Sequence, residues 1–488
     1  MSLKLKSLNK IDFENTYANE LNGICERCSP TSFNKSEILL RNYSLAAELG
    51  IDESFLDSKE CLDIFSGRIV SENSIPIAQA YSGHQYGNFN PQMGDGRAIL
   101  LGEINQKDIQ LKGSGQTPFS KRGDGKSALG PVLREYVISE FMNSVNIPTT
   151  RSLMAIKSNE NVFRDEEIPG GILARVANSH IRIGTFEYVS YFKPNSLETL
   201  ADYVIKRHYP ELSDADNKYI SLFAAICDKQ SFLISKWMGV GFVHGVMNTD
   251  NMLVSGETID YGPCAFIDEY NPSIYFSSID QHGRYSYKNQ PAIMIWNLSK
   301  LAEAFNPLVD KNKEKAVIEL SEVLNLAMPT YQEYFYIEMS KKFGLKNVDQ
   351  EVINLINNYL KILMDNSVDF VLSFRDLGKL LSENKKIDDT VFKNVKNFNN
   401  WYYKFLNLLS LKKLAKLKVS KTMDSYNPCY IPRNHLIEDA IINAVTGDMR
   451  KINLIAELLK EPFTEKDGYE SYTEPSTSDE SYVTYCGT

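Results

Sequence analysis

The segment His244-Gly-Val-Met-Asn-Thr-Asp-Asn251, followed nine residues later by Asp260-Tyr-Gly262, constrains this chain more than any other feature. Its residues are good turn formers, so the plainest interpretation is a surface turn. The spacing is also that of two loops that hold a metal–nucleotide complex, in which an Asn and the Asp of a later D-x-G turn supply the oxygen ligands. The pattern therefore predicts a loop-borne nucleotide site.

Phosphotransferases of the protein-kinase type carry H-x-D-x-x-x-x-N on one loop, where the Asp accepts the proton of the attacking hydroxyl. Here His244 and Asn251 keep that spacing, but the base position holds Val246, which cannot accept a proton. A second carboxylate, Asp250, directly precedes Asn251. The metal ligands are thus predicted to be intact while the proton acceptor has moved, which favours a nucleotide-dependent reaction other than ordinary phosphate transfer.

Composition excludes several other classes of protein. The 488 residues carry a formal net charge of −9, which argues against a nucleic-acid-binding surface, and no apolar run is long enough to span a membrane. The first residues do not form a secretory signal, so we expect a cytoplasmic protein with reduced thiols, in which Cys25 and Cys28 are incidental. The histidines lack the spacing of a zinc hydrolase.

The apolar patterns predict an α+β protein with a two-lobed, protein-kinase-like fold. We expect an N-terminal extension over 1–75, a β-rich nucleotide-binding lobe over 76–194, a mainly helical lobe over 195–460 and a mobile polar tail over 461–488. The strands expected in the first lobe cover 98–103, 108–112, 172–177 and 181–189. The helices expected around it cover 35–49 and 131–146.

Charged residues of the β-rich lobe form a second predicted constellation. Lys112 ends a strand-like run, and Glu135 lies 23 residues later in a predicted helix. Kinases pair a strand lysine with a helix glutamate to fix the lysine on the phosphates, although a solvated surface glutamate is the simpler alternative. Arg97, Arg175 and Arg182 would add cations suited to a polyphosphate.

Two glycine-rich loops lie in the same region. Gly94-Asp-Gly-Arg97 would let the backbone approach phosphates, but it also fits a plain hairpin. The loop over 113–127 ends in Gly125-Lys-Ser, yet Ser120 stands where a P-loop requires its first glycine, so we reject a P-loop. Asp124 and Gly125 remain predicted nucleotide contacts.

The chain resembles the selenoprotein O family, kinase-like proteins that adenylylate other proteins. The resemblance covers most of the chain and rests on AYSGHQYGNFNPQMGDGRA at 80–98, QLKGSGQTPFSKRGDGKSALGPVLREYVISEFM at 110–142, GGILARVANSHIRIGTFEY at 170–188, GFVHGVMNTDNM at 241–252, IDYGPCAFIDEY at 259–270 and SSIDQHGRYSYKNQPAIMIWNL at 277–298.

The resemblance implies that ATP binds in the reverse of its orientation in kinases, with Mg²⁺ or Mn²⁺ as cofactor and proteins as substrates. AMP would be joined to Ser, Thr or Tyr hydroxyls. Asp250 would be the proton acceptor, Asn251 and Asp260 the metal ligands, and Glu135 the residue that orients the lysine. The implied ATP contacts are Gly94, Gly96, Arg97, Lys112, Asp124, Gly125, Arg175, Arg182 and Asp260.

Some bacterial relatives resemble redox switches that join a C-terminal cysteine to one after the D-[YF]-G-P motif. In this chain the corresponding position is Phe276, which puts such a switch in doubt. Cys486 with Cys264 is the remaining candidate pair. Two other functions stay open at this point: a kinase that uses Asp250 as its base, and a pseudokinase scaffold that binds nucleotide only for stability.

Overall fold

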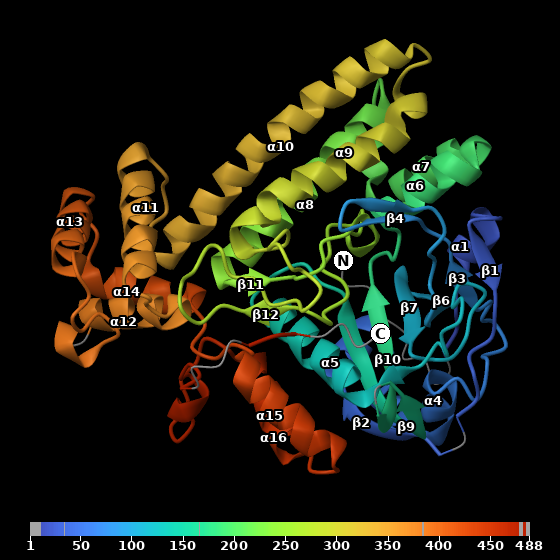
Figure 1. Cartoon of the computed structure of the whole chain (residues 1–488), viewed down its shortest axis with the longest axis horizontal. Helices are drawn as coiled ribbons and strands as arrows, with labels where there is room; N and C mark the ends of the chain where they lie inside the picture. The colour runs from blue at the N-terminus through green and yellow to red at the C-terminus, as the bar shows by residue number, and fades with distance from the viewer. Residues whose placement is uncertain (1–10, 34, 165, 383–384, 478–481, 485–488) are drawn as a thin grey trace.

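A computed structural model describes residues 11–33, 35–164, 166–382, 385–477 and 482–484. Its main sheet has the strand order β1-β3-β6-β7-β10-β9-β2, and all its pairings are antiparallel. In Figure 1 this sheet lies at one end of the molecule and long helices form the other. The strands are β1 (Cys25–Arg27), β2 (Glu37–Arg41), β3 (Ile77–Gln79), β6 (Ala98–Ile104), β7 (Lys107–Lys112), β9 (Arg151–Phe163) and β10 (Glu167–Ala177), with the short β8 (Ser127–Ala128) paired to β10.

Both faces of this sheet are buried. Alternate residues of β6 point to opposite sides, so that Leu100 joins the core under α5 (Leu129–Ser144) while Ile99 and Leu101 join a second core. That second core is closed by α2 (Tyr43–Leu49), α3 (Glu53–Leu56) and α4 (Lys59–Phe65). Mixed α and β structure with an antiparallel sheet agrees with the predicted class.

Among the described residues of the N-terminal extension predicted over 1–75, two short segments join the main sheet as strands. Strands β1 and β2 form its two edges. The helix expected over 35–49 is half wrong, because 37–41 form β2 and only 43–49 are helical. The change occurs at Asn42, whose side chain accepts a hydrogen bond from the backbone N–H of Leu45 and so caps α2.

The strand expected over 181–189 is wrong. Residues Ile183–Phe192 form helix α6, which begins directly after Arg182. The apolar residues Ile183, Phe186 and Val189 recur every third position and are all buried, so they occupy one face of a helix. Arg182 therefore sits at a helix start rather than in a strand.

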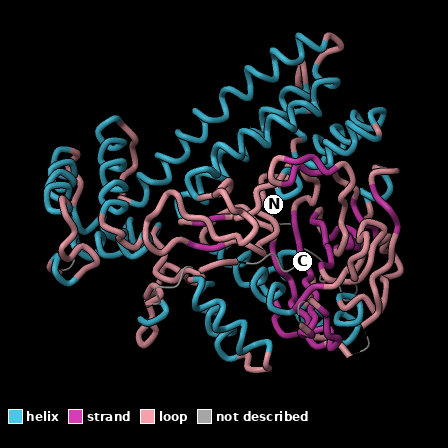
Figure 2. Tube along the Cα trace, viewed as in Figure 1, coloured by secondary structure: helices cyan, strands magenta, loops and turns pink. Residues whose placement is uncertain are grey.

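Most of the remaining helices lie away from the main sheet, whereas α1 contacts β6 and both α15 and α16 contact α5. Figure 2 shows most of the strands gathered at one end of the molecule. Helices α8, α9 and α10 run side by side, and α11–α14 form a group beyond them. The bounds are α1 (Thr16–Glu20), α7 (Leu197–His208), α8 (Lys218–Val240), α9 (Gln290–Val309), α10 (Lys313–Lys342), α11 (Gln350–Asp365), α12 (Phe370–Ser382), α13 (Phe398–Leu411), α14 (Lys416–Tyr426), α15 (Asn434–Val445) and α16 (Arg450–Lys460).

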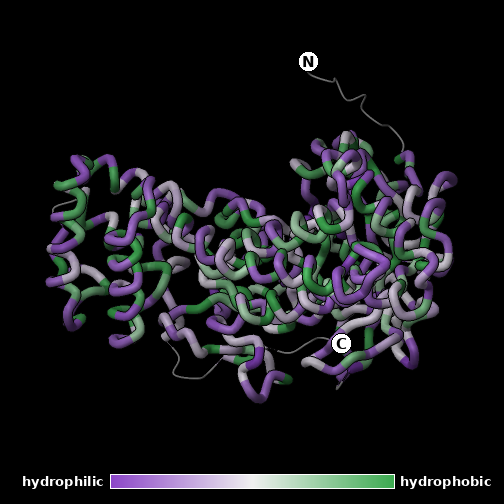
Figure 3. The backbone as a smooth tube through the Cα atoms, turned by 90° about the horizontal axis from the view of Figure 1, so that it is seen from above, coloured by the Kyte–Doolittle hydropathy of each residue, from purple (hydrophilic) through white to green (hydrophobic). Residues whose placement is uncertain are grey.

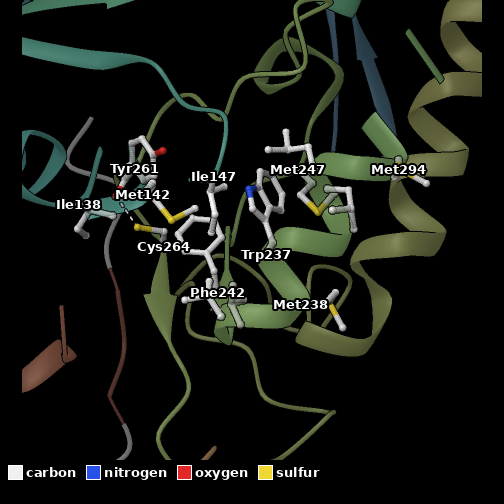
Figure 4. Packing of buried hydrophobic residues seen from close by; sticks show 14 of the residues in the cluster. Ile138, Met142, Ile147, Trp237, Met238, Phe242, Met247, Tyr261, Cys264 and Met294 are labelled. Carbon is white, nitrogen blue, oxygen red and sulfur yellow. Dashed lines mark hydrogen bonds between the residues drawn. The ribbon is translucent and has the colours of Figure 1, made fainter. Parts of the chain in front are cut away.

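A hydrophobic core packs against the two motif loops, which are the segments 244–251 and 260–262. Strands β11 (Phe242–Val243) and β12 (Ala265–Phe266) pair next to Trp237, whose indole donates a hydrogen bond to the Thr258 hydroxyl at 2.9 Å. The imidazole of His244 stacks on Trp237, with 5.2 Å between ring centroids, and bonds the carbonyl of Ile259 at 2.8 Å. Figure 4 shows Trp237 and Phe242 among the buried residues of this core. His244 thus links the two loops structurally.

The described part of the C-terminal segment is packed, where we predicted a mobile tail. The guanidinium of Arg375 bonds Glu465 at 2.8 Å, and Arg433 bonds the Thr473 carbonyl at 2.9 Å. Tyr482 donates to Glu438 at 2.7 Å, and Glu438 also accepts from the buried Arg134. Charged and aromatic side chains on the helices therefore anchor a segment whose composition is polar.

In the part of the chain that the structure describes, we find no helix long and apolar enough to cross a membrane. Figure 3 shows hydrophobic and hydrophilic residues alternating along the chain.

Lys342, at the end of α10, is a buried cation whose removal should stabilise the protein. It is 6% exposed, and its ammonium lies 4.4 Å from the ring centroid of Phe374. Burial lowers the pKa of Lys342 to about 7. Since the unfolded side chain binds its proton up to about pH 10.4, folding is penalised most at and below pH 7, and the penalty fades as the pH rises toward 10.4.

We expect Lys342→Met to raise the free energy of unfolding at pH 7 by roughly 2–4 kcal/mol, because every tenfold loss of proton affinity on folding costs about 1.4 kcal/mol. The gain should shrink steadily between pH 7 and about 10. Thermal unfolding of both proteins at several pH values measures it, with the exposed Lys346→Met as control. A gain that is equal at all pH values would contradict a buried charge as its cause.

Candidate active site

A cavity of about 710 Å³ opens between the sheet and the two motif loops. Strands β6, β7 and β10, helix α5 and the two motif loops contribute to its wall. The predicted nucleotide, lysine-orienting, proton-accepting and metal-binding residues all line it, namely Gly94, Gly96, Arg97, Lys112, Asp124, Gly125, Glu135, Arg175, Arg182, Asp250, Asn251 and Asp260. Residues that are up to 166 positions apart in the sequence thus meet in one cleft.

Three cations converge on Asp260 inside this cleft. The ammonium of Lys112 lies 2.6 Å from Asp260 Oδ1 and 2.6 Å from Glu135 Oε2. Arg175 Nη1 lies 2.9 Å from Asp260 Oδ1 and 3.1 Å from Glu135 Oε1, and Arg182 Nη1 lies 3.1 Å from Asp260 Oδ2. The structure therefore brings the predicted Lys112–Glu135 pair together, and the simpler alternative of a solvated glutamate is wrong.

Asp260 is held ionised by these neighbours. Burial alone would raise the pKa of its carboxyl, but Lys112, Arg175 and Arg182 hold that pKa well below its usual range. Its backbone φ is +61°, a left-handed conformation that is uncommon for a residue other than glycine. Such strain is found most often at functional sites, where the surrounding structure enforces it.

Two buried residues behind the cations were missed in the sequence. Gln110 accepts a hydrogen bond from Arg175 Nη2 at 2.6 Å and donates one to Asp95 at 3.0 Å. The Asp95 carboxylate lies 3.4 Å from Arg182 Nη2. Gln110 is two positions before Lys112 on β7, so it shares a face with it, and that spacing was a usable signal.

The two glycine loops pack against each other without room for side chains. A Cβ on Gly94 would lie 2.3 Å from the ring of Phe119, and one on Gly125 would lie 2.0 Å from the carbonyl oxygen of Gly115. Both glycines have positive φ. At the mouth of the cleft, Asp124 pairs with Arg164 at 3.0 Å. The alternative of a plain hairpin over 94–97 is wrong, because β6 after this loop pairs with β3 and β7 and not with a strand that directly precedes the loop.

Asp250 lies on a short 3-10 turn, η3 (Thr249–Asn251), deep in the cleft. Burial raises the pKa of its carboxyl to about 7, although Arg182 opposes this rise. Its backbone carbonyl accepts a hydrogen bond from Arg182 Nη1 at 2.6 Å, while Oδ1 has no hydrogen-bond partner among the described residues. A buried carboxylate oxygen without a donor is well suited to accept a proton.

The donor set fits a divalent cation that also binds substrate phosphates. Asn251 donates through Nδ2 to the Val246 carbonyl at 2.9 Å, which directs the amide so that Oδ1 remains as an acceptor. Asp260 supplies a carboxylate close by. No group of three or more His, Cys, Asp or Glu side chains that could hold a metal occurs in the described ranges. Mg²⁺ commonly takes one or two protein ligands and completes its shell with phosphates and water.

A family model described as protein adenylyltransferase SelO matches residues 7–460. The chain belongs to this SelO family. A protein nucleotidyltransferase YdiU of Rhizobium johnstonii is 43% identical over 486 residues, which cover 98% of this chain and 97% of the relative. Relatives with the same name occur in Maridesulfovibrio salexigens, 44% identical over 98% of each chain, and in Bradyrhizobium diazoefficiens, 42% identical over 98% of this chain and 99% of the relative.

In this SelO-family chain, Cys264 is a poor candidate for redox chemistry. It is fully buried outside the cleft lining, and its thiol donates to the Tyr261 carbonyl at 3.1 Å. Burial raises the pKa of Cys264 to about 12, which suppresses the reactive thiolate. Cys486 lies outside the described residues, so its pairing stays a prediction. Thr484 bonds the Pro263 carbonyl at 2.7 Å, so the described chain end does reach this loop.

Proposed function

We propose that this protein transfers AMP from ATP to a hydroxyl group of another protein and releases pyrophosphate. One observation carries the proposal: Val246 stands where a kinase has its base, and Asp250 lines the same cleft with an unpartnered Oδ1 among the described residues. The relatives' name, protein nucleotidyltransferase, supports the same reaction.

The cation cluster suits the β- and γ-phosphates. Lys112, Arg175 and Arg182 lie within hydrogen-bonding distance of one carboxylate, and a polyphosphate can replace that carboxylate as their shared anion. The α-phosphorus would then face Asp250. The acceptor oxygen attacks this phosphorus, the bond to the β-bridging oxygen breaks, and the acceptor proton passes to Asp250. Pyrophosphate leaves on the three cations, which offset its charge.

Asn251 and Asp260 would hold Mg²⁺ or Mn²⁺ against the phosphates. When bound, such an ion offsets the charge that develops on the phosphate oxygens. Gly94, Gly96 and Gly125 would bring backbone N–H groups close to the nucleotide, since none of them has a side chain to keep it away.

We also propose a two-lobed arrangement like that of protein kinases, with 76–194 as the nucleotide-binding lobe and 195–460 as the helical lobe. The pair of Lys112 on β7 with Glu135 on α5 supports it, because kinases join a strand lysine to a helix glutamate in this way. The acceptors would be Ser, Thr or Tyr of proteins in the cytoplasm.

ATP labelled on either the α- or the γ-phosphate tests the reaction. With Mg²⁺ and a mixture of candidate acceptor proteins, we expect stable label on protein from α-labelled ATP only. Label from γ-labelled ATP would instead support a kinase that uses Asp250 as base. Label from neither, with ATP binding retained, would support a scaffold.

Chelation of divalent cations should stop the transfer without loosening the protein. We expect EDTA to abolish α-label transfer and added Mg²⁺ or Mn²⁺ to restore it. Because the proposed site gives the cation two protein ligands, Asn251 and Asp260, the cation alone should leave the unfolding temperature almost unchanged and should raise it only together with ATP. Full transfer in excess EDTA would contradict the assigned metal site.

A further inference from the structure

A small hairpin outside the main sheet covers the loop that carries Asp250. Its strands β4 (Gly83–Gln85) and β5 (Asn88–Asn90) pair with each other, and β4 contacts both η3 and α6. Figure 1 shows β4 next to α9 and α6. We propose that His84 of this hairpin and Glu187 of α6 are positioning residues that fix Thr249, and through it Asp250. The proposal rests on the function proposed above, in which Asp250 accepts the proton.

Thr249 accepts a hydrogen bond from the hairpin. The backbone N–H of His84 donates to Thr249 Oγ1 at 2.7 Å. The His84 imidazole pairs through Nδ1 with Glu187 Oε1. Thr249 is fully buried and Glu187 is 6% exposed, so water competes little for these contacts. Burial raises the pKa of Glu187, while the adjacent Thr249 hydroxyl and His84 imidazole oppose that rise.

Aromatic contacts fix the orientation of the imidazole. The His84 ring lies 4.9 Å from the ring of Phe89 on the opposite strand and 5.3 Å edge-on from the ring of Trp296 on α9. A ring packed in this way presents one nitrogen to Glu187. The helix that carries Glu187 begins directly after Arg182, which donates a hydrogen bond to the Asp250 carbonyl. Hairpin and α6 therefore hold the same short turn from different sides.

The hairpin also touches Asp250 and Asn248 directly. A Cβ on Gly83 would lie 2.4 Å from Asp250 Oδ1 and 3.0 Å from its Cβ, so the carboxylate lies against a residue that has no side chain. The backbone N–H of Tyr86 donates to Asn248 Oδ1 at 3.1 Å. Successive loop residues 248, 249 and 250 are thus each contacted by the hairpin, and a shift of the hairpin would move the proton acceptor.

A purely structural role for the His84–Glu187 pair makes a different prediction. Removing one partner of a buried pair destabilises a protein wherever the pair lies. Positioning requires in addition that the chemical step slows while nucleotide affinity stays, because misplacement of a reacting group by about 1 Å can lower a rate roughly 10²-fold. The rate of transfer at saturating ATP separates the two roles.

Glu187→Leu and the conservative Glu187→Gln provide the first comparison. We expect Glu187→Leu to lower the single-turnover rate of α-label transfer roughly 10–100-fold with an ATP Kd within about twofold of wild type. Glu187→Gln keeps an oxygen for His84 and should retain most of the rate. A rate of Glu187→Leu equal to wild type, per folded molecule, would overturn the proposal.

Combination with Asp250→Asn tests whether Glu187 acts through Asp250. If it does, Glu187→Leu should have little further effect in the Asp250→Asn background, because the group that it positions is already lost. An equal fold-loss in both backgrounds would show that Glu187 acts elsewhere and would overturn the proposal.

Gly83→Ala provides an independent test from the hairpin side. Its φ is not left-handed, so the substitution adds a methyl group without backbone strain, and this methyl would lie 2.4 Å from Asp250 Oδ1 and 2.9 Å from Met93 Sδ. We expect a slower transfer with unchanged ATP affinity. Gly239→Ala in α8 is the matched control, since its nearest atom would lie 3.8 Å away and its rate should match wild type. A transfer rate of Gly83→Ala equal to that of Gly239→Ala would contradict the proposal that the hairpin positions Asp250.

The wild-type label distinguishes a failure of this proposal from a failure of the proposed function. If wild type transfers the γ-label instead, adenylylation is wrong, and the same rate ratios measured with γ-label still decide the positioning role. If it transfers neither label, both proposals fail.

Discussion

Replacing Asp260 with Ala is expected to lower AMP transfer by about 10³-fold or more. The variant loses a metal ligand and the charge around which the phosphate-binding cations are arranged, and each loss acts on the transition state. Lys112, Arg175 and Arg182 remain, so ATP should still bind. Transfer from α-labelled ATP and ATP affinity, measured on the same preparation, test this expectation.

The same substitution should also destabilise the protein in the absence of ATP. Asp260 balances buried cations, and an uncompensated buried charge costs about 3–5 kcal/mol. ATP should restore much of the lost unfolding temperature. Asp369→Ala is the control, because it breaks the buried pair with Arg433 outside the cleft and should lower stability but not the rate of folded enzyme. Transfer of the α-label by Asp260→Ala at the wild-type rate would contradict the assignment of Asp260 as a metal ligand.

The residues of the cleft could be predicted from the sequence because each belongs to a short motif whose residue types and spacing indicate its chemical role. The spacing of Asn251 and Asp260 and the strand position of Lys112 each require only local geometry. The residues that these side chains contact could be identified only from the three-dimensional structure. Asp95 looked like a turn residue, yet the structure buries it against Arg182, and no local pattern predicts which carboxylate a sheet encloses.

The secondary-structure prediction was wrong where the same apolar pattern fits both the period of a strand and the period of a helix. The run Ile181–Val189 alternates at its start as a strand does, but the apolar spacing from Ile183 onward follows a helix. The error mattered, because α6 begins directly after Arg182, which donates to the Asp250 carbonyl, and it carries Glu187, which pairs with His84 of the hairpin. The edge strands β1 and β2 were missed for another reason: they are short and their partners lie far away in the sequence.

Replacing Asp250 with Asn should lower the rate of AMP transfer by roughly 10²–10⁴, the usual contribution of a general base, while ATP still binds. The amide has nearly the same size and can still fill the space beneath Gly83. It cannot accept the proton of the attacking hydroxyl. Single-turnover transfer at saturating ATP measures the effect, and an unchanged rate would remove Asp250 from the chemistry.

Val246→Asp in the Asp250→Asn background decides between the two orientations of ATP. Val246 is 7% exposed and lines the cleft, so an aspartate there would restore the position of a kinase base. With the β- and γ-phosphates on Lys112, Arg175 and Arg182, the phosphorus nearest the acceptor is the α-phosphorus, and a base at 246 should restore neither transfer. Recovery of γ-phosphate transfer would mean that ATP binds as in kinases, and the reversed orientation would then be wrong.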